Sequence, residues 1–352
     1  GGFLRRYWQD YYKGLRLGAE LGKIKPGGRY LDVGCALGTM LAGVRDSSGW
    51  QVAGTEFSGE TARAGLEING VGKDFNNGEY GPDLINSAAL DFISRNKDKP
   101  FFLYYTEMLT HDPYQPTPDS PGWDPKATGE KANIDTKHFA DMVAYMDKLV
   151  GKLVLKLEEL KLRDNTLILF VGDNGTGKKV LSEMTDGRKI AGGKNMSTDG
   201  GTHVPLIANY PGVIKPGTVL QDLVDTTDFL PTVCEAAGVT IPAELNIDGR
   251  SFMPRLRGEK GQPREWVYSW FSRAGGPKAS KEFARNQKYK LYSDGKFFDV
   301  PADTLEASPL AEEKLTEEAK AAQKMLQGVL DKFKNARPEK FAKMMGTGKG
   351  GE

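Results

Sequence analysis

One short segment combines an apolar run with residue types that could bind a ligand. Residues 167–171 read Leu-Ile-Leu-Phe-Val, and residues 172–179 follow as Gly-Asp-Asn-Gly-Thr-Gly-Lys-Lys. An apolar run of this length that ends in glycine and aspartate is typical of a buried strand followed by a turn. Ligands of open α/β sheets bind outside the carboxyl ends of strands, so Asp173 and Asn174 are candidates for binding phosphate or a metal ion.

The glycine spacing after this run fits a phosphate-binding loop, but two residue types in the segment do not suit phosphate binding. Gly172, Gly177 and Lys178 match the pattern Gly-x-x-x-x-Gly-Lys, in which the next residue must be Ser or Thr to bind magnesium. Lys179 occupies that position, and Asp173 would place a negative charge beside the phosphate. A carboxylate next to an amide oxygen suits Ca²⁺ or Mg²⁺ instead. An Asp-Asn-Gly turn that only ends a strand is the alternative interpretation.

Several separate segments, in the right order between residues 80 and 310, resemble those of a type I sulfatase of the alkaline-phosphatase-like superfamily. They include Thr-His-Asp-Pro at 110–113, Gly-Asp-Asn-Gly at 172–175, Gly-Gly-Lys-Asn at 192–195 and Gly-Gly-Thr-His-Val-Pro-Leu-Ile at 200–207. Because many separate blocks agree, the resemblance is specific, and it implies the fold and the reaction of that family.

The resemblance implies a role for four residues in the hydrolysis of a sulfate ester. Asp173 and Asn174 match the second pair of ligands of a divalent cation, expected to be Ca²⁺ or Mg²⁺. His111 matches the histidine that contacts the ester oxygen, where an imidazole can protonate the leaving alcohol. Lys194 matches a lysine that binds a sulfate oxygen, and cations around the sulfuryl group stabilise its charge during transfer. The implied partner is a small-molecule or carbohydrate sulfate ester, with phosphate and phosphonate esters left open.

Parts of the family's catalytic machinery are not found in the 352 residues. The family's nucleophile is a formylglycine, which is made from a cysteine or serine followed by x-Pro-x-Arg. Cys35 is followed by Ala-Leu-Gly and Cys234 by Glu-Ala-Ala, so neither fits. The paired aspartates that supply the first metal ligands and the Gly-Lys-x-His block are also missing. We therefore expect this chain to hydrolyse sulfate esters poorly or not at all. A non-catalytic protein that binds an anion or a metal is the alternative.

The N-terminal segment carries a different resemblance. Residues 30–38, Tyr-Leu-Asp-Val-Gly-Cys-Ala-Leu-Gly, resemble the first motif of a class I S-adenosylmethionine-dependent methyltransferase. The resemblance implies that Asp32, Gly34 and Gly38 lie at the amino-acid part of S-adenosylmethionine, and that Glu56 binds the ribose hydroxyls. A βαβ packing unit without a ligand is one alternative, and it would take the place of missing sulfatase strands in a single hybrid fold. A recombined or artificial join of two proteins is another.

Apolar segments with strand and helix periods alternate along the chain, which favours an α/β fold with a mainly parallel sheet flanked by helices. A partial Rossmann-like βαβ unit precedes this sheet. A small antiparallel sheet with a helix follows it, because Asp-Gly separates two apolar arms within residues 289–298. The strongest helical period covers residues 137–160. The predicted domains are a methyltransferase-like fragment at 1–75, a sulfatase-like core at 76–262, a C-terminal subdomain at 263–337 and a disordered tail at 338–352.

The composition argues against several functions. The chain has 48 Lys and Arg against 47 Asp and Glu, so its net charge of +1 gives no indication of a surface for nucleic acid or a membrane. Three histidines, His111, His138 and His203, argue against a histidine-rich zinc site. We expect His138 on the exposed side of its helix without a role, and His203 in a structural hydrogen bond to nearby backbone. Members of the family are commonly periplasmic or extracellular, but no signal peptide is visible, so compartment and oligomeric state stay open.

Overall fold

The computed structural model describes most of the chain after its first quarter. The described residues are 78–127, 134–272 and 280–336, together with the backbones of four strands closer to the N-terminus. Gly34 and Gly38 of the methyltransferase motif lie outside the described residues, and so does the predicted tail at 338–352.

The chain divides into two compact units. Unit 1 comprises Gly1–Thr166 and Gly238–Leu245, and unit 2 comprises Leu167–Ala237 and Asn246–Glu352. His111 therefore belongs to unit 1, whereas Asp173, Asn174 and Lys194 belong to unit 2. The domain boundaries expected from the sequence stay predictions.

Unit 1 contains a five-stranded sheet with the order β4-β3-β2-β1-β5. Its strands are β1 (Arg29–Val33), β2 (Gln51–Glu56), β3 (Gly65–Ile68), β4 (Val71–Asp74) and β5 (Phe102–Tyr105). β1 pairs in parallel with both β2 and β5, whereas β3 pairs antiparallel with β2 and β4. Asp32 lies in β1, and Glu56 ends β2. β1 and β2 thus share one sheet with β5.

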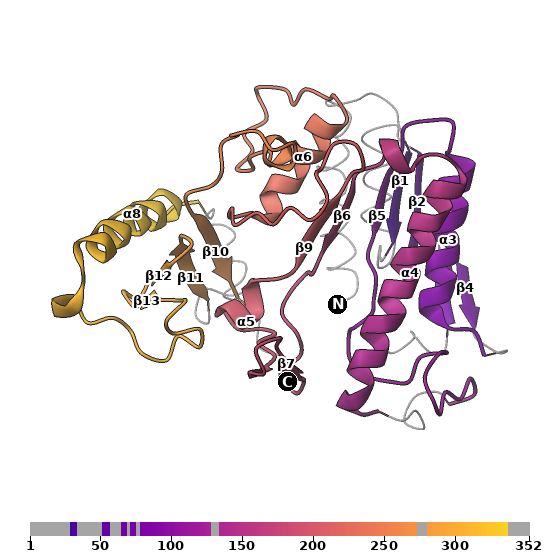
Figure 1. Cartoon of the computed structure of the whole chain (residues 1–352), viewed down its shortest axis with the longest axis horizontal. Helices are drawn as coiled ribbons and strands as arrows, with labels where there is room; N and C mark the ends of the chain where they lie inside the picture. The colour runs from indigo at the N-terminus through magenta and orange to yellow at the C-terminus, as the bar shows by residue number, and fades with distance from the viewer. Residues whose placement is uncertain are drawn as a thin grey trace, which may run out of the picture. The chain divides into compact units, whose positions relative to one another are not determined.

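Two long helices of unit 1 pack side by side (Figure 1). α3 (Gly81–Arg95) has Pro82 in its first turn, where the missing N–H costs no helical hydrogen bond. α4 (Phe139–Glu159) carries apolar residues at helical spacing, as predicted. The Tyr145 hydroxyl of α4 donates a hydrogen bond to the Asp83 carboxylate of α3 at 2.6 Å, which fixes the two helices together. No helix in the described part of the chain has both the length and the apolar character needed to cross a membrane.

The first strands of unit 2 pair differently from the prediction. β6 (Ile168–Val171) and β9 (Leu206–Asn209) are antiparallel, with Val171 opposite Leu206. The connection between them holds the hairpin of β7 (Leu181–Glu183) and β8 (Lys189–Ala191). A parallel pair needs a crossover connection, usually a helix, and the only helix of residues 172–205 is α5 (Asp199–Thr202), which has 4 residues. The expected mainly parallel sheet therefore does not describe β6 and β9.

Apart from the C-terminal helix, the remaining helices in the described part of the chain are short. The α-helices are α5 (Asp199–Thr202), α6 (Phe229–Ala236) and α7 (Met253–Leu256). The 3₁₀ helices are η2 (Thr136–His138), η3 (Arg163–Asn165), η4 (Thr226–Asp228) and η6 (Glu312–Lys314).

The C-terminal part of unit 2 is an antiparallel sheet covered by one helix, as the sequence predicts (Figure 1). The strands are β10 (Val267–Phe271), β11 (Lys281–Arg285), β12 (Tyr289–Tyr292) and β13 (Phe297–Asp299). α8 (Glu317–Phe333) starts at Thr316, whose hydroxyl accepts a hydrogen bond from the Ala319 N–H. Leu326 of α8 packs with Leu291 and Phe297 of the sheet in one buried core.

Candidate functional site

Backbone hydrogen bonds join three loop segments beyond the end of β6. The Gly175 N–H donates to the Gly201 carbonyl at 3.1 Å, and the Lys194 N–H donates to the Thr176 carbonyl at 3.0 Å. These bonds place Asn174 and Lys194 on neighbouring stretches of backbone. We call the three segments the glycine loops, and they are residues 172–177, 192–196 and 199–203.

The glycines of these loops are needed because backbone touches backbone. A Cβ atom on Gly175 would lie 1.9 Å from the Gly200 carbonyl oxygen. One on Gly193 would lie 2.4 Å from the Gly200 carbonyl carbon, and one on Gly201 would lie 2.2 Å from the Met196 oxygen. Any side chain at these three positions would push the segments apart. The glycine-rich sequence after β6 therefore serves close packing of loops, and it does not form a phosphate cradle.

Asp173 and Asn174 follow β6 after Gly172, as predicted, with an exposed and a half-buried side chain respectively. The Asp173 carboxylate has no ion-pair partner among the described residues of unit 2. Ca²⁺ takes about six to eight oxygen ligands, usually several of them carboxylates. In the described ranges, no three His, Cys, Asp or Glu side chains come together to hold a metal ion. These two residues do not therefore complete a calcium site with other described side chains.

Lys194 is held by its backbone and leaves its ammonium group unpaired within its unit. Its N–H bonds to Thr176, and the following residue, Asn195, has the left-handed φ of 69°. The Met196 N–H then donates to the Gly193 carbonyl at 2.8 Å and closes a tight turn around Lys194. No described residue of unit 2 forms an ion pair with the Lys194 side chain, which is half-buried. A cation carried on a constrained backbone and without an ion-pair partner in its unit can receive an anion.

His111 lies in unit 1, in the loop that follows β5. Its side chain is 55% exposed, and its Nδ1 is 2.6 Å from the Asp112 carbonyl oxygen. Because a carbonyl oxygen can only accept, Nδ1 must carry the proton of this hydrogen bond. Nε2 is therefore the ring nitrogen that can exchange a proton with a ligand. Whether His111 acts together with Lys194 stays a prediction.

His138 is buried, which contradicts the prediction that it lies on the exposed side of the helix. Its side chain is 6% exposed, and Nδ1 lies 3.3 Å from an Asp141 carboxylate oxygen. The Ser120 hydroxyl donates to the same carboxylate at 2.9 Å. The helical period fails here because α4 begins only at Phe139, and Asp135 caps the 3₁₀ turn before it. Asp141 thus connects the loop around Ser120 to α4, and His138 contacts the same carboxylate oxygen.

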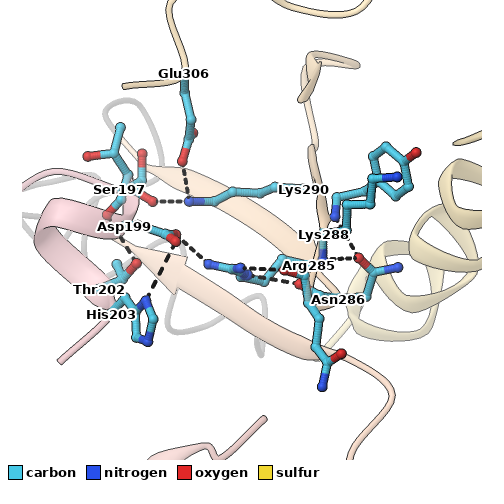
Figure 2. Close-up of polar contacts among 12 residues, drawn as sticks. Ser197, Asp199, Thr202, His203, Arg285, Asn286, Lys288, Lys290 and Glu306 are labelled. Carbon is cyan, nitrogen blue, oxygen red and sulfur yellow. Dashed lines mark hydrogen bonds and ion pairs between the residues drawn. The ribbon is translucent and has the colours of Figure 1, made fainter. Parts of the chain in front are cut away.

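His203 makes a side-chain contact as well as the backbone contact that we expect. Its N–H donates to the Asp199 carbonyl, and its Nδ1 lies 3.7 Å from the Asp199 carboxylate (Figure 2). Arg285 of β11 pairs with the same carboxylate. Burial by itself raises the pKa of Asp199, but the hydrogen bonds from His203 and Arg285 outweigh it and hold this pKa at about 2. The sequence gives no sign of this pair, because its members are far apart in the chain.

Two family models match the chain. The one described as sulfatase covers residues 47–239, which is more than half of the 352 residues. The chain belongs to the sulfatase family. The second model, described as the C-terminal part of N-sulphoglucosamine sulphohydrolase, covers residues 193–335 and so includes Lys194 and the C-terminal sheet.

Curated sulfatases are identical to this chain at about a third of the matched positions. Steryl-sulfatase of Rattus norvegicus is 33% identical over 179 residues, which are 49% of this chain and 29% of that protein. Arylsulfatase A of Homo sapiens is 31% identical over 175 residues, which are 50% of this chain and 32% of that protein. The chain therefore spans about a third of the length of these curated relatives.

Solved structures share the fold over a larger part of the chain. A complex of Ps i-CgsB with k-i-k-neocarrahexaose has a TM-score of 0.64 and 22% identity, covering 90% of this chain and 73% of that one. The PsFucS1 sulfatase from Pseudoalteromonas sp. has a TM-score of 0.63 and 20% identity, covering 90% and 72%. The chain therefore has the α/β fold of sulfatases.

These matches do not support the methyltransferase resemblance of the N-terminal segment. The sulfatase match begins at residue 47 and includes Glu56, the acid expected to bind ribose. Asp32, the other described residue of that motif, lies in β1 beside the sulfatase strand β5. A glycine turn after one strand and an acid at the end of the next occur in α/β sheets of many functions. The two motifs are thus weak grounds for S-adenosylmethionine binding.

Proposed function

We propose that the glycine loops form part of the sulfate-binding site of a type I sulfatase. The observation that carries the proposal is the backbone-bonded arrangement of Asn174 and Lys194, together with the unpaired ammonium of Lys194. Lys194 would bind a sulfate oxygen, where a fixed positive charge stabilises the anionic group. The substrate that we propose is a sulfate ester of a carbohydrate or a small molecule, because one protein of the same fold was solved with k-i-k-neocarrahexaose.

His111 is the residue that we propose for the leaving group. Because Nδ1 is engaged by the Asp112 carbonyl, Nε2 is free to hold a proton at the bridging oxygen of the ester. We further propose Asp173 and Asn174 as two ligands of a divalent cation, which would neutralise charge on the sulfuryl oxygens. Since the described residues do not complete a metal site, no step of the proposal depends on the cation.

For this chain, the proposal is binding of the sulfate ester with little or no turnover. Neither Cys35 nor Cys234 stands in the x-Pro-x-Arg context of the family's nucleophile. Without covalent catalysis the rate is expected to fall by several orders of magnitude, whereas binding by Lys194 does not need the nucleophile.

The proposal is tested by calorimetric titration of the full chain with sodium sulfate and with 4-nitrophenyl sulfate. Lys194→Ala is expected to weaken binding about 10-fold or more, the size expected for a charged hydrogen bond. Lys178→Ala is the matched control, because Lys178 is an exposed lysine directly after the first glycine loop. Equal losses in both variants, or the absence of saturable binding in the parent chain, would overturn the proposal. Release of 4-nitrophenol at rates typical of enzymes would overturn the part that concerns turnover.

A further inference from the structure

Lys290 is a fully buried lysine in the C-terminal sheet. Its side chain has 0% exposure, and its Nζ lies 2.8 Å from a Glu306 carboxylate oxygen that is itself nearly buried. Nζ also lies 4.1 Å from the centre of the Phe283 ring. Removing an ammonium group from water is costly unless it is paired and hydrogen-bonded, and an apolar residue would fill this core position at lower cost. The presence of lysine at this buried position must therefore be explained by the groups that its ammonium binds.

The ammonium of Lys290 holds the loop that carries Lys194. Nζ donates a hydrogen bond to the Ser197 carbonyl, as Figure 2 shows. Ser197 is 2% exposed, and its hydroxyl oxygen lies 3.0 Å from the Tyr292 hydroxyl of the same strand. Tyr292 is in turn bonded to Glu306. Strand β12 thus forms hydrogen bonds with both the main chain and the side chain of Ser197.

Ser197 follows Lys194 closely in the sequence, and the backbone between the two residues is constrained. The turn from Gly193 to Met196 is closed by a hydrogen bond of 2.8 Å, and Asn195 in its centre has a left-handed backbone. On the other side, the Lys194 N–H is bonded to Thr176. The backbone of Lys194 is therefore fixed on two sides. It bonds to the loop after β6 on one side, and on the other the nearby Ser197 bonds to β12.

We propose that Lys290 is a positioning residue of the sulfate site, which sets the place of the Lys194 ammonium by fixing Ser197. The inference rests on the proposed function, because it needs Lys194 to bind sulfate. It assigns the C-terminal sheet a part in ligand binding through Lys290, which acts on the ligand by way of Ser197 and Lys194.

The test is a double-mutant cycle on the full chain, with the dissociation constant of sodium sulfate as the readout. Lys290→Met keeps most of the side-chain volume and removes the charge. It is expected to weaken sulfate binding about 10-fold, within the range of coupling between residues of one network. In a Lys194→Ala background the same substitution is expected to have no further effect on sulfate binding.

Leu326→Ala is the control for a purely structural role. Leu326 is fully buried in the same C-terminal core but makes no contact with the glycine loops. It is expected to lower the melting temperature and to leave sulfate affinity unchanged, because binding is measured well below the melting transition. Tyr292→Phe is the second variant if Lys290→Met does not fold. It removes one hydroxyl, and it should weaken binding about 3-fold, again only when Lys194 is present.

The outcomes separate the inference from the function on which it rests. If Lys194→Ala weakens binding while folded Lys290→Met and Tyr292→Phe bind like the parent chain, the positioning role is wrong and the proposed function stands. If Lys194→Ala binds sulfate like the parent chain, the proposed function is wrong and the inference falls with it. An equal loss of affinity in Leu326→Ala would also overturn the positioning role.

Discussion

Arg285 of the C-terminal sheet and Asp199 of helix α5 form an ion pair although 86 residues separate them, and their side chains are only 12% and 20% exposed. The pair connects two parts of unit 2 that no local sequence pattern joins. Lys290 donates a hydrogen bond to Ser197, two residues before Asp199. The loop before α5 is therefore attached to the sheet through the charged side chains of Lys290 and Arg285. Removing either partner would leave a charge without compensation, which is the costly way to break a buried pair.

The first prediction concerns the pH dependence of stability. The pKa of Asp199 is about 2 in the folded chain against an ordinary value of 3.8. A carboxyl whose pKa is lowered by folding stabilises the native state above its unfolded pKa, and this stabilisation is lost as the pH falls toward the folded value. Asp199 should thus contribute about 2 kcal/mol at neutral pH, lost between about pH 4 and pH 2. The contribution shows as the difference in urea-unfolding free energy between the parent chain and Asp199→Asn.

The control for this prediction is Asp147→Asn, at an exposed position of α4. It is expected to change the unfolding free energy by less than about 0.5 kcal/mol at every pH. The prediction fails if the difference between the parent chain and Asp199→Asn is the same at pH 6 and at pH 2.5.

The second prediction uses two adjacent glycines of α5. A Cβ atom on Gly201 would lie 2.2 Å from a backbone oxygen, whereas one on Gly200 would meet nothing closer than 3.6 Å. Gly201→Ala is expected to cost more than about 2 kcal/mol, because backbone must move. Gly200→Ala is expected to be neutral or to stabilise by up to about 1 kcal/mol. Thermal melts of the two variants, recorded side by side, check the expectation, and similar melting temperatures would contradict it.

The third prediction concerns the left-handed residue Asn195, whose φ is 69°. Asn195→Val should destabilise by about 1–3 kcal/mol, because a β-branched residue is strained in this conformation. Asn195→Gly should be tolerated within about 0.5 kcal/mol. Asn209→Val on the exposed end of strand β9 is the matched control, since valine suits a strand. Equal urea midpoints for Asn195→Val and Asn209→Val would contradict the predicted strain.

The fourth prediction concerns calcium. A ligand at 100 times its dissociation constant stabilises the native state by about 2.7 kcal/mol, which would shift a melt by a few degrees. Because Asp173 and Asn174 offer only part of the usual ligand set, millimolar Ca²⁺ should shift the melting temperature by less than about 1 °C. S-adenosylhomocysteine should also leave it unchanged. A larger calcium shift that disappears in Asp173→Ala would show that residues outside the described ranges complete the site.

The elements that depend on local patterns could be predicted from the sequence, and those that depend on distant contacts could not. The period of residues 137–160 corresponds to α4, and Asp-Gly marks the turn between β12 and β13. The turn with Asp173 stands directly after its strand, as the apolar run indicates. The antiparallel pairing of β6 with β9 depends on how a long connection folds, which periodicity does not report.

Lys290 shows the limit most clearly. Tyr289 and Leu291 are buried on one face of β12 and Lys290 is buried on the other, so both faces are covered. An alternating pattern would place Lys290 on a solvated face, and only its partners Glu306 and Ser197, which is 93 residues away, explain why it is inside. The family resemblance could name Lys194 but carried no information on what holds it.

The backbone packing of the glycine loops also defines where this site can vary. A library randomised at Gly175, Gly193 and Gly201 would yield almost only unfolded chains, because the constraint is on main-chain contact. Met196 and Thr202 have exposed side chains on the same loops. Diversifying these two positions would change the chemistry presented beside Lys194 without disturbing the scaffold that carries it, which makes them the natural starting points for engineering altered ligand selectivity.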